Sequence, residues 1–251
     1  MEERYRTVIA HEFEDCIKRT IIRLENEETH RPFHSALLSP EALFWSRFER
    51  SFSTSFGQRV VEKISKVAAL AGGATDAETQ KLSSFELPRN QLAAIENHIG
   101  HLRGNTLGRP REWGADLAAV GAQRGGELER VRVISDLWWV KDGINHYMSI
   151  KTVKPNLDQT AEAKRDLLKL QLSDPNCRVY FGLYYNPFGE LRENYSWALP
   201  MRIFDFRNDP VILVGRDYWD TLGGNGFYEE VLAIADECGT RTRKIVGNLN
   251  L

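Results

Sequence analysis

Cysteines are few in this chain, and long apolar runs are absent. Its 251 residues include only three cysteines, Cys16, Cys177 and Cys238. Their odd number and wide spacing match neither a disulfide framework nor a zinc site. The first residues contain no apolar signal core, and nowhere do about 18 apolar residues follow one another without a charge. We therefore expect a cytoplasmic protein with buried free thiols and no membrane contact.

An excess of positive charge is also missing. Lysine and arginine number 33 against 35 aspartates and glutamates, which argues against a non-specific binder of polyanions. A locally basic cleft remains compatible with this balance. Basic residues gather in one glycine-rich stretch, at Arg103, Arg109, Arg111, Arg124, Arg130 and Arg132. This stretch is either a DNA-contacting segment or simply a solvated loop.

The apolar pattern divides the chain into two parts that we expect to form one compact unit. Residues 1–105 are predicted to be mostly helical, with helices over Val8–Leu24, from Pro40 onward, over Phe56–Leu70 and over Leu87–Leu102. The segment Thr29–His34 interrupts the first of them. Residues 106–251 are predicted to form a mixed-sheet core.

Strand patterns dominate the second part. They cover a hairpin at 131–151, then Cys177–Tyr185 and Val211–Val214, while 158–170 has helical spacing and a final helix covers 226–237. A strand, a helix and a further strand imply a crossover connection, with the helix packed on the sheet. The predicted fold class is therefore α/β, a mixed sheet flanked by helices, with an added N-terminal helical region.

The hairpin is the most informative segment. Two β-rich runs flank Asp142-Gly143, a pair typical of a two-residue turn. If these two residues form the turn, Asp136 lies opposite Ser149, and Lys151 projects from the same face. Opposite Cβ atoms in a sheet are about 4.5 to 5.5 Å apart. The pattern thus predicts a carboxylate and an ammonium group close enough to act on one phosphate.

Phosphodiester hydrolysis needs a hard divalent cation held by carboxylate oxygens, a water beside it and a positive group near the phosphate. Asp136 can supply the carboxylate, and Lys151 can supply the positive group. The alternative from the residues alone is an ordinary cross-strand ion pair at the surface.

The spacing of Asp136 and Lys151 resembles the PD-(D/E)XK nuclease superfamily. The segment 149–160, which begins Ser-Ile-Lys-Thr-Val-Lys-Pro-Asn, looks like the signature of the TdeIII group of type II restriction endonucleases. Three further segments resemble related enzymes that cut at GGNCC-centred sites: 53–64, 185–189 and 214–219. The four segments occur in the expected order along the chain.

This resemblance implies a Mg²⁺-dependent endonuclease that cuts a short palindromic site in double-stranded DNA as a homodimer. Residues 106–251 would then be the catalytic core, and residues 1–105 a candidate for dimerisation and for clamping DNA. Asp136 would be the metal ligand and Lys151 the motif lysine. The departure is Ser149, which stands where the superfamily has Asp or Glu. A replacement acid could come from Glu162 in the following helix or from Glu62 in the N-terminal part. Both could equally be solvated helix residues.

Base reading needs Arg, Asn or Gln side chains at the groove edges. Our candidates for DNA contact are Arg103, Arg109, Arg111, Arg124, Lys154, Asn156, Gln159, Asn186 and Arg192, although helix capping is the simpler role for Asn156. Two alternatives to a restriction enzyme remain: a repair or junction-resolving nuclease, and a catalytically inactive DNA-binding module on the same fold. A restriction enzyme predicts a cognate DNA methyltransferase gene as its neighbour.

Overall fold

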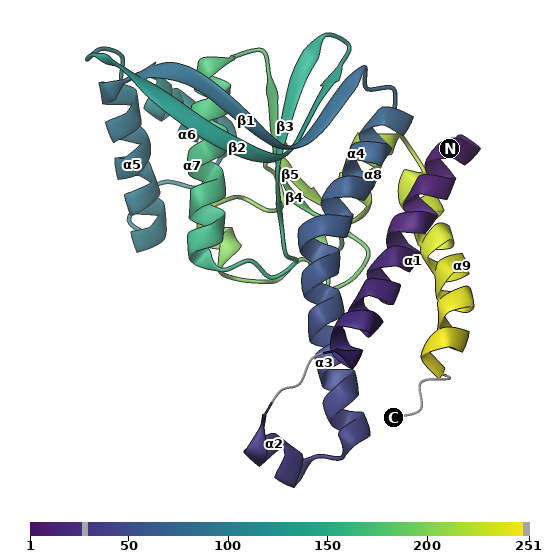
Figure 1. Cartoon of the computed structure of the whole chain (residues 1–251). Coiled ribbons are helices and arrows are strands. Elements are labelled where there is room, and N and C mark those ends of the chain that lie inside the picture. The colour runs from purple at the N-terminus through teal and green to yellow at the C-terminus, as the bar shows by residue number, and fades with distance from the viewer. Residues whose placement is uncertain (27–29, 248–251) are drawn as a thin grey trace.

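A five-stranded mixed sheet forms the centre of the part of the chain described by the computed structural model, residues 1–26 and 30–247 (Figure 1). The strands follow the order β1-β2-β3-β4-β5. Their bounds are β1 Asp76–Pro88, β2 Leu128–Lys141, β3 Ile144–Lys151, β4 Arg178–Leu183 and β5 Ile212–Val214. β1 pairs with β2 and β2 with β3 in antiparallel orientation, whereas β3 pairs with β4 and β4 with β5 in parallel orientation. The predicted α/β class is confirmed.

The β2–β3 hairpin has the expected turn. Asp142 and Gly143 have φ values of 53° and 73°, as a two-residue turn with two left-handed positions requires. Lys141 pairs with Ile144, and the pairing continues to Leu137 opposite Met148. The register predicted from the sequence is confirmed over this range.

Strand β1 is the main feature that the sequence pattern missed. It pairs with β2 along its whole length, from Asp76 opposite Val140 to Pro88 opposite Leu128. The sheet therefore draws on residues from both sides of position 105. The strand was not recognised because it is an edge strand whose residues are mostly polar and alternate between exposed and half-buried, so its apolar periodicity is weak.

Nine α-helices surround the sheet in the described residues. Their bounds are α1 Glu3–Glu25, α2 Pro32–Leu37, α3 Pro40–Ser55, α4 Val61–Ala71, α5 Arg89–Gly104, α6 Trp113–Gly121, α7 Leu157–Ser173, α8 Arg216–Gly223 and α9 Phe227–Gly247. A π-helical turn, Phe56–Val60, joins α3 to α4, and short 3₁₀ turns cover Arg192–Asn194 and Pro200–Arg202. The predicted cap before α3 is present, since the Ser39 hydroxyl accepts a hydrogen bond from the Ala42 N–H at 3.3 Å. Thr29, in the predicted break after α1, lies outside the described residues.

Each face of the sheet has its own apolar core. Helices α5, α6 and α7 bury residues such as Ile99 and Leu168 against one face. Helices α1, α4, α8 and α9 bury residues such as Ile64 and Tyr218 against the other. Helices α1, α3 and α9 extend away from the sheet, and α2 lies at the far end (Figure 1). None of the described helices combines the length and apolar character that crossing a membrane requires.

Candidate active site

Asp136 on β2 is the centre of the site. Its Oδ2 accepts hydrogen bonds from the Ile150 backbone N–H at 2.7 Å, the Lys151 Nζ at 3.1 Å and the Ser149 hydroxyl at 3.3 Å. The backbone pairing of β2 with β3 ends at Leu137 and Met148. Beyond this pair, the Asp136 side chain accepts the hydrogen bond that the Ile150 N–H of β3 donates. The structure thus brings together the three residues that the hairpin pattern placed on one face.

Glu62, from the first turn of α4, reaches the same centre through a residue that the sequence did not indicate. The side-chain amide nitrogen of Gln80, on β1, donates to Glu62 Oε2 at 2.9 Å and to Asp136 Oδ1 at 3.4 Å. Gln80 went unrecognised because no pattern identified β1 as a strand beside β2. Of the two acids considered as replacements at position 149, Glu62 is therefore the one joined to Asp136.

The surroundings of Glu62 disfavour the ionised form of its carboxyl group. Burial raises its pKa, the hydrogen bond from Gln80 lowers it, the negative charge of Asp136 raises it, and Lys151 lowers it, with a net rise. The ammonium group of Lys151 lies 3.1 Å from Asp136, and both side chains are about one fifth exposed. The carboxylates of Asp136 and Glu62 and the ammonium group of Lys151 therefore lie in one site that is partly shielded from solvent.

Asp136, Lys151, Ser149 and Gln80 border a hollow of about 410 Å³, and Glu62 lies behind Gln80, outside its lining. Strand β2 contributes Arg132 and Ile134 to its lining, and α7 contributes Glu162 and Asp166. Glu162 is exposed. Its negative charge helps to raise the pKa of Asp166, although burial is the larger cause. Glu162 thus faces the same hollow as Asp136 without being joined to it as Glu62 is.

The donor set suits magnesium. No cluster of three His, Cys, Asp or Glu side chains converges as a closed cage in the described residues. Mg²⁺, however, usually binds one or two carboxylates and completes its shell with water and substrate phosphate. The carboxylates of Asp136 and Glu62, joined by the Gln80 amide, are a donor set that would fit this cation.

Three of the arginines expected at DNA make internal contacts. Arg109 pairs with the buried Asp116 at 2.6 Å. Arg111 donates to the Arg202 carbonyl at 2.5 Å. Arg192 donates to the carbonyls of Phe206 and Asp209, each at 2.6 Å. Their guanidinium groups hold loops of the α5–α7 side together.

Four other residues that we expected at DNA also contact the protein itself: Arg103, Asn156, Gln159 and Asn186. Asn156 and Gln159 form a reciprocal capping box at the start of α7, which confirms the capping role considered for Asn156. Asn186 closes its own turn by donating to the Leu191 carbonyl at 2.7 Å. Arg103 pairs with Asp158.

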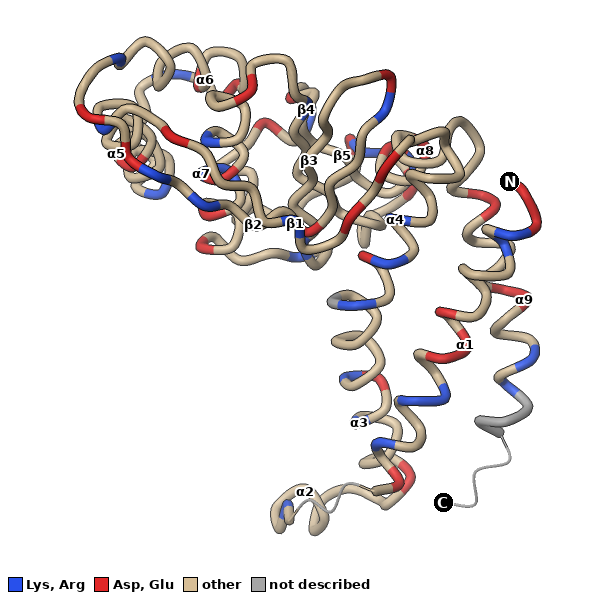
Figure 2. Tube along the Cα trace, turned by 45° about the horizontal axis from the view of Figure 1, so that its top comes forward, with Lys and Arg blue, Asp and Glu red and all other residues tan. Residues whose placement is uncertain are grey.

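Arg124 and Lys154 remain exposed. The Lys154 Nζ lies 5.3 Å from the centre of the Phe188 ring and 5.7 Å from that of Trp197. Acidic and basic residues both occur along β1 and β2 (Figure 2). The exposed basic residues among the candidates for DNA contact are thus few.

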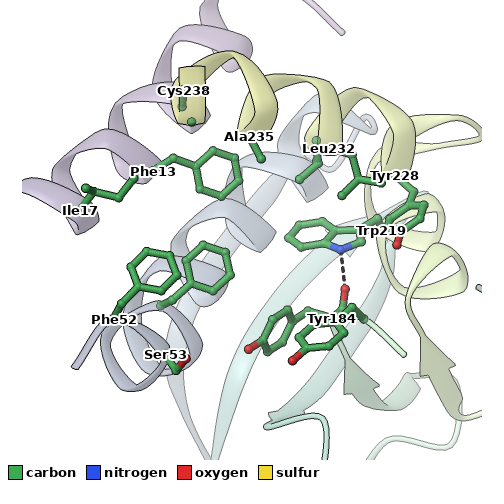
Figure 3. A pocket seen from close by; sticks show the side chains of 14 residues that line it. Phe13, Ile17, Phe52, Ser53, Tyr184, Trp219, Tyr228, Leu232, Ala235 and Cys238 are labelled. Atoms are coloured by element: carbon green, nitrogen blue, oxygen red, sulfur yellow. Dashed lines mark hydrogen bonds between the residues drawn. The ribbon is translucent and has the colours of Figure 1, made fainter. Parts of the chain in front are cut away.

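A separate apolar cavity of about 390 Å³ lies among α1, α3 and α9. Figure 3 shows Phe13, Phe52 and Trp219 around it, with the Trp219 indole N–H donating to the Tyr184 carbonyl at 2.8 Å. Its lining is largely aromatic and aliphatic and includes no carboxylate. It lacks the groups that phosphodiester chemistry needs, so the candidate active site is the one around Asp136.

Comparison with known proteins identifies the family of this chain. A family model described as "Type II restriction endonuclease, HinfI" matches residues 1–239. The chain belongs to this family. The sequence resemblance had named the TdeIII group, whereas the matching model is that of HinfI, and the assignment as a type II restriction endonuclease is common to both.

Curated relatives of this HinfI-family protein come from Herpetosiphon aurantiacus. The type II restriction enzyme HgiEI is 27% identical over 241 residues, 94% of this chain and 86% of its own length. HgiCII is 27% identical over 236 residues, 91% and 84% of the two chains, and HgiBI is 27% identical over 215 residues, 83% and 77%. No solved structure gives a significant match.

Proposed function

We propose that this protein is a Mg²⁺-dependent type II restriction endonuclease that hydrolyses both strands of a short palindromic DNA site as a homodimer. The observation that carries the proposal is that Asp136 and Lys151 line one hollow, and that Gln80 joins Glu62 to Asp136, in a chain of a restriction endonuclease family. By resemblance the site is GGNCC or a close relative, and a cognate methyltransferase is the expected genomic neighbour.

Each residue has a defined part in the reaction. Asp136 and Glu62 would hold the cation, which when bound lowers the pKa of water and offsets charge on the phosphate. Lys151 orients the attacking water and balances negative charge at the phosphate from its position 3.1 Å from Asp136. Ser149 and the Ile150 N–H fix the Asp136 carboxylate through its Oδ2. Glu162 is the alternative second acid.

DNA is proposed to approach over the hollow. Arg132 is exposed and lines the hollow, four residues from Asp136 along β2. At about 3.4 Å per residue, this places it about 14 Å from Asp136, which suits contact with a neighbouring phosphate. Arg124 and Lys154 are the other exposed candidates from the sequence.

Incubation of the protein with plasmid DNA and Mg²⁺ tests the function. Discrete fragments are expected, with no cleavage in EDTA. Lys151→Ala and Asp136→Asn should abolish cutting while site-specific binding persists. Nicking that follows DNA structure rather than sequence would instead indicate a repair or junction nuclease, and intact DNA would indicate an inactive binding module.

A further inference from the structure

Gln80 has an unusual backbone as well as a central position. Its φ is 55°, a left-handed value that non-glycine residues rarely adopt. Its neighbours Thr79 and Lys81 pair with Leu137 and Ser135, while Gln80 itself has no partner in the register. Such conformations persist where the surrounding structure holds them, and they concentrate at functional sites.

The Gln80 side chain connects two carboxylates of the site. Its amide nitrogen reaches carboxylates from two different elements, Glu62 on α4 at 2.9 Å and Asp136 on β2 at 3.4 Å. Asp136 also has the ammonium group of Lys151. For Glu62, Gln80 is the hydrogen-bond donor that the described residues provide. Without this amide, two like charges would face each other across the site.

We propose that Gln80 is a positioning residue that preassembles the cation site. In the metal-free protein its amide holds Glu62 against Asp136, and it gives way when a divalent cation binds both carboxylates. The proposal rests on the proposed function to the extent that a divalent cation is the cofactor.

The advantage of this arrangement is preorganisation. A cation that binds two separated carboxylates must first bring the two negative groups together, and this ordering weakens the observed affinity. A neutral donor that already spans them removes much of that cost. Outer residues that orient metal ligands typically contribute about 10- to 100-fold to metal affinity.

The test measures Mn²⁺ binding to the full-length, DNA-free protein by the electron paramagnetic resonance signal of free Mn²⁺. Gln80→Leu keeps much of the side-chain bulk but removes the donor. Gln80→Gly also removes the donor and relieves the left-handed backbone, so it folds even if the leucine variant does not. Leu82→Ala is the matched control, because Leu82 is exposed on the same strand and lies outside the hollow.

We expect Mn²⁺ affinity to fall about tenfold in both Gln80 variants and to stay unchanged in Leu82→Ala. The unfolding midpoint of Gln80→Gly in EDTA should not fall below that of the wild type, which separates positioning from simple stabilisation. Wild-type Mn²⁺ affinity in Gln80→Gly would overturn the proposal, as would a wild-type protein that binds no Mn²⁺.

Failure of this inference is distinguishable from failure of the proposed function. If Gln80→Gly binds Mn²⁺ normally while the wild type cuts DNA and Asp136→Asn does not, only the role of Gln80 is refuted. If the wild type cuts no DNA, the proposed function fails whatever the Mn²⁺ result.

Discussion

Replacement of Glu62 by Gln should separate stability from activity. The Glu62 Oε2 and Asp136 Oδ1 atoms are no more than about 6 Å apart, because both accept from one nitrogen at 2.9 and 3.4 Å. Two unit charges at about 6 Å repel by about 0.7 kcal/mol in water and about 3 kcal/mol at an effective dielectric of about 20. Lys151 offsets part of this repulsion. Glu62→Gln should therefore stabilise the metal-free protein by about 1 kcal/mol while abolishing Mg²⁺-dependent cleavage.

The pH dependence of this gain has a definite sign. The pKa of Glu62 is raised in the folded protein, so the folded state binds its proton more tightly than the unfolded state does. The ionised group costs stability above the raised pKa, and this cost disappears below the unfolded value of about 4.3. The difference between variant and wild type should thus be full at pH 8 and vanish near pH 4.

Urea unfolding in EDTA, measured between pH 4 and pH 8, checks this prediction together with plasmid cleavage in Mg²⁺. Glu162→Gln tests the alternative second acid in the same assays, since Glu162 is exposed and lines the hollow beside Asp136. It should change stability by less than about 0.5 kcal/mol and retain cleavage. A Glu62→Gln protein that cuts DNA normally, or one less stable than the wild type at pH 8, would refute the reasoning.

Two further predictions concern a buried histidine and the DNA surface. Burial lowers the pKa of His146 to about 4, so the wild type should lose about 3 kcal/mol of stability as pH falls from about 6.5 to 4. His146→Phe should lose correspondingly less in acid unfolding, and parallel curves would contradict this. Arg132→Ala should weaken binding to all DNA sequences and reduce the slope of log affinity against log salt by about 1. An unchanged slope in a binding titration would remove Arg132 from the DNA surface.

The hairpin could be predicted from the sequence because its determinants are local. Asp142-Gly143 specifies the turn, and the turn fixes which residues of β2 and β3 lie opposite each other. Asp136 and Lys151 follow from that register alone. No contact with the rest of the protein is needed to place them on one face.

The other half of the site depends on contacts that sequence patterns do not encode. Glu62 and Gln80 lie 18 residues apart on a helix and an edge strand, and each is close to Asp136 only because β1 pairs with β2. An edge strand needs little apolar periodicity, so the pattern of β1 was too weak to recognise. Nothing in the residues preceding Pro88 indicates this pairing.

The arginines show a different limit. A guanidinium group serves a phosphate or a protein acceptor equally well. Arg192 meets two backbone carbonyls of its own loop region, and Arg109 meets a buried carboxylate. Which acceptor an arginine contacts depends on the conformation of the surrounding loops. The spacing of residues in the sequence does not predict that conformation.

The two oxygens of Asp136 explain why serine is tolerated at position 149. Oδ2 already accepts from Ile150, Lys151 and Ser149, whereas among the described residues Oδ1 accepts only the longer contact from Gln80, which also donates to Glu62. We therefore expect a cation at Oδ1, and an acid at position 149 would face the oxygen that is already hydrogen-bonded.

Ser149→Asp should consequently fail to restore cleavage to Glu62→Gln in a plasmid assay with Mg²⁺. A carboxylate at 149 would replace a hydrogen-bond donor to Oδ2 with a like charge, and at neutral pH it should lower the free energy of unfolding by about 1 to 3 kcal/mol. Restored cutting in the double variant would mean that the cation binds on the Oδ2 side. The second acid would then belong on β3, as in the general superfamily pattern, and α4 would have no part in the metal site.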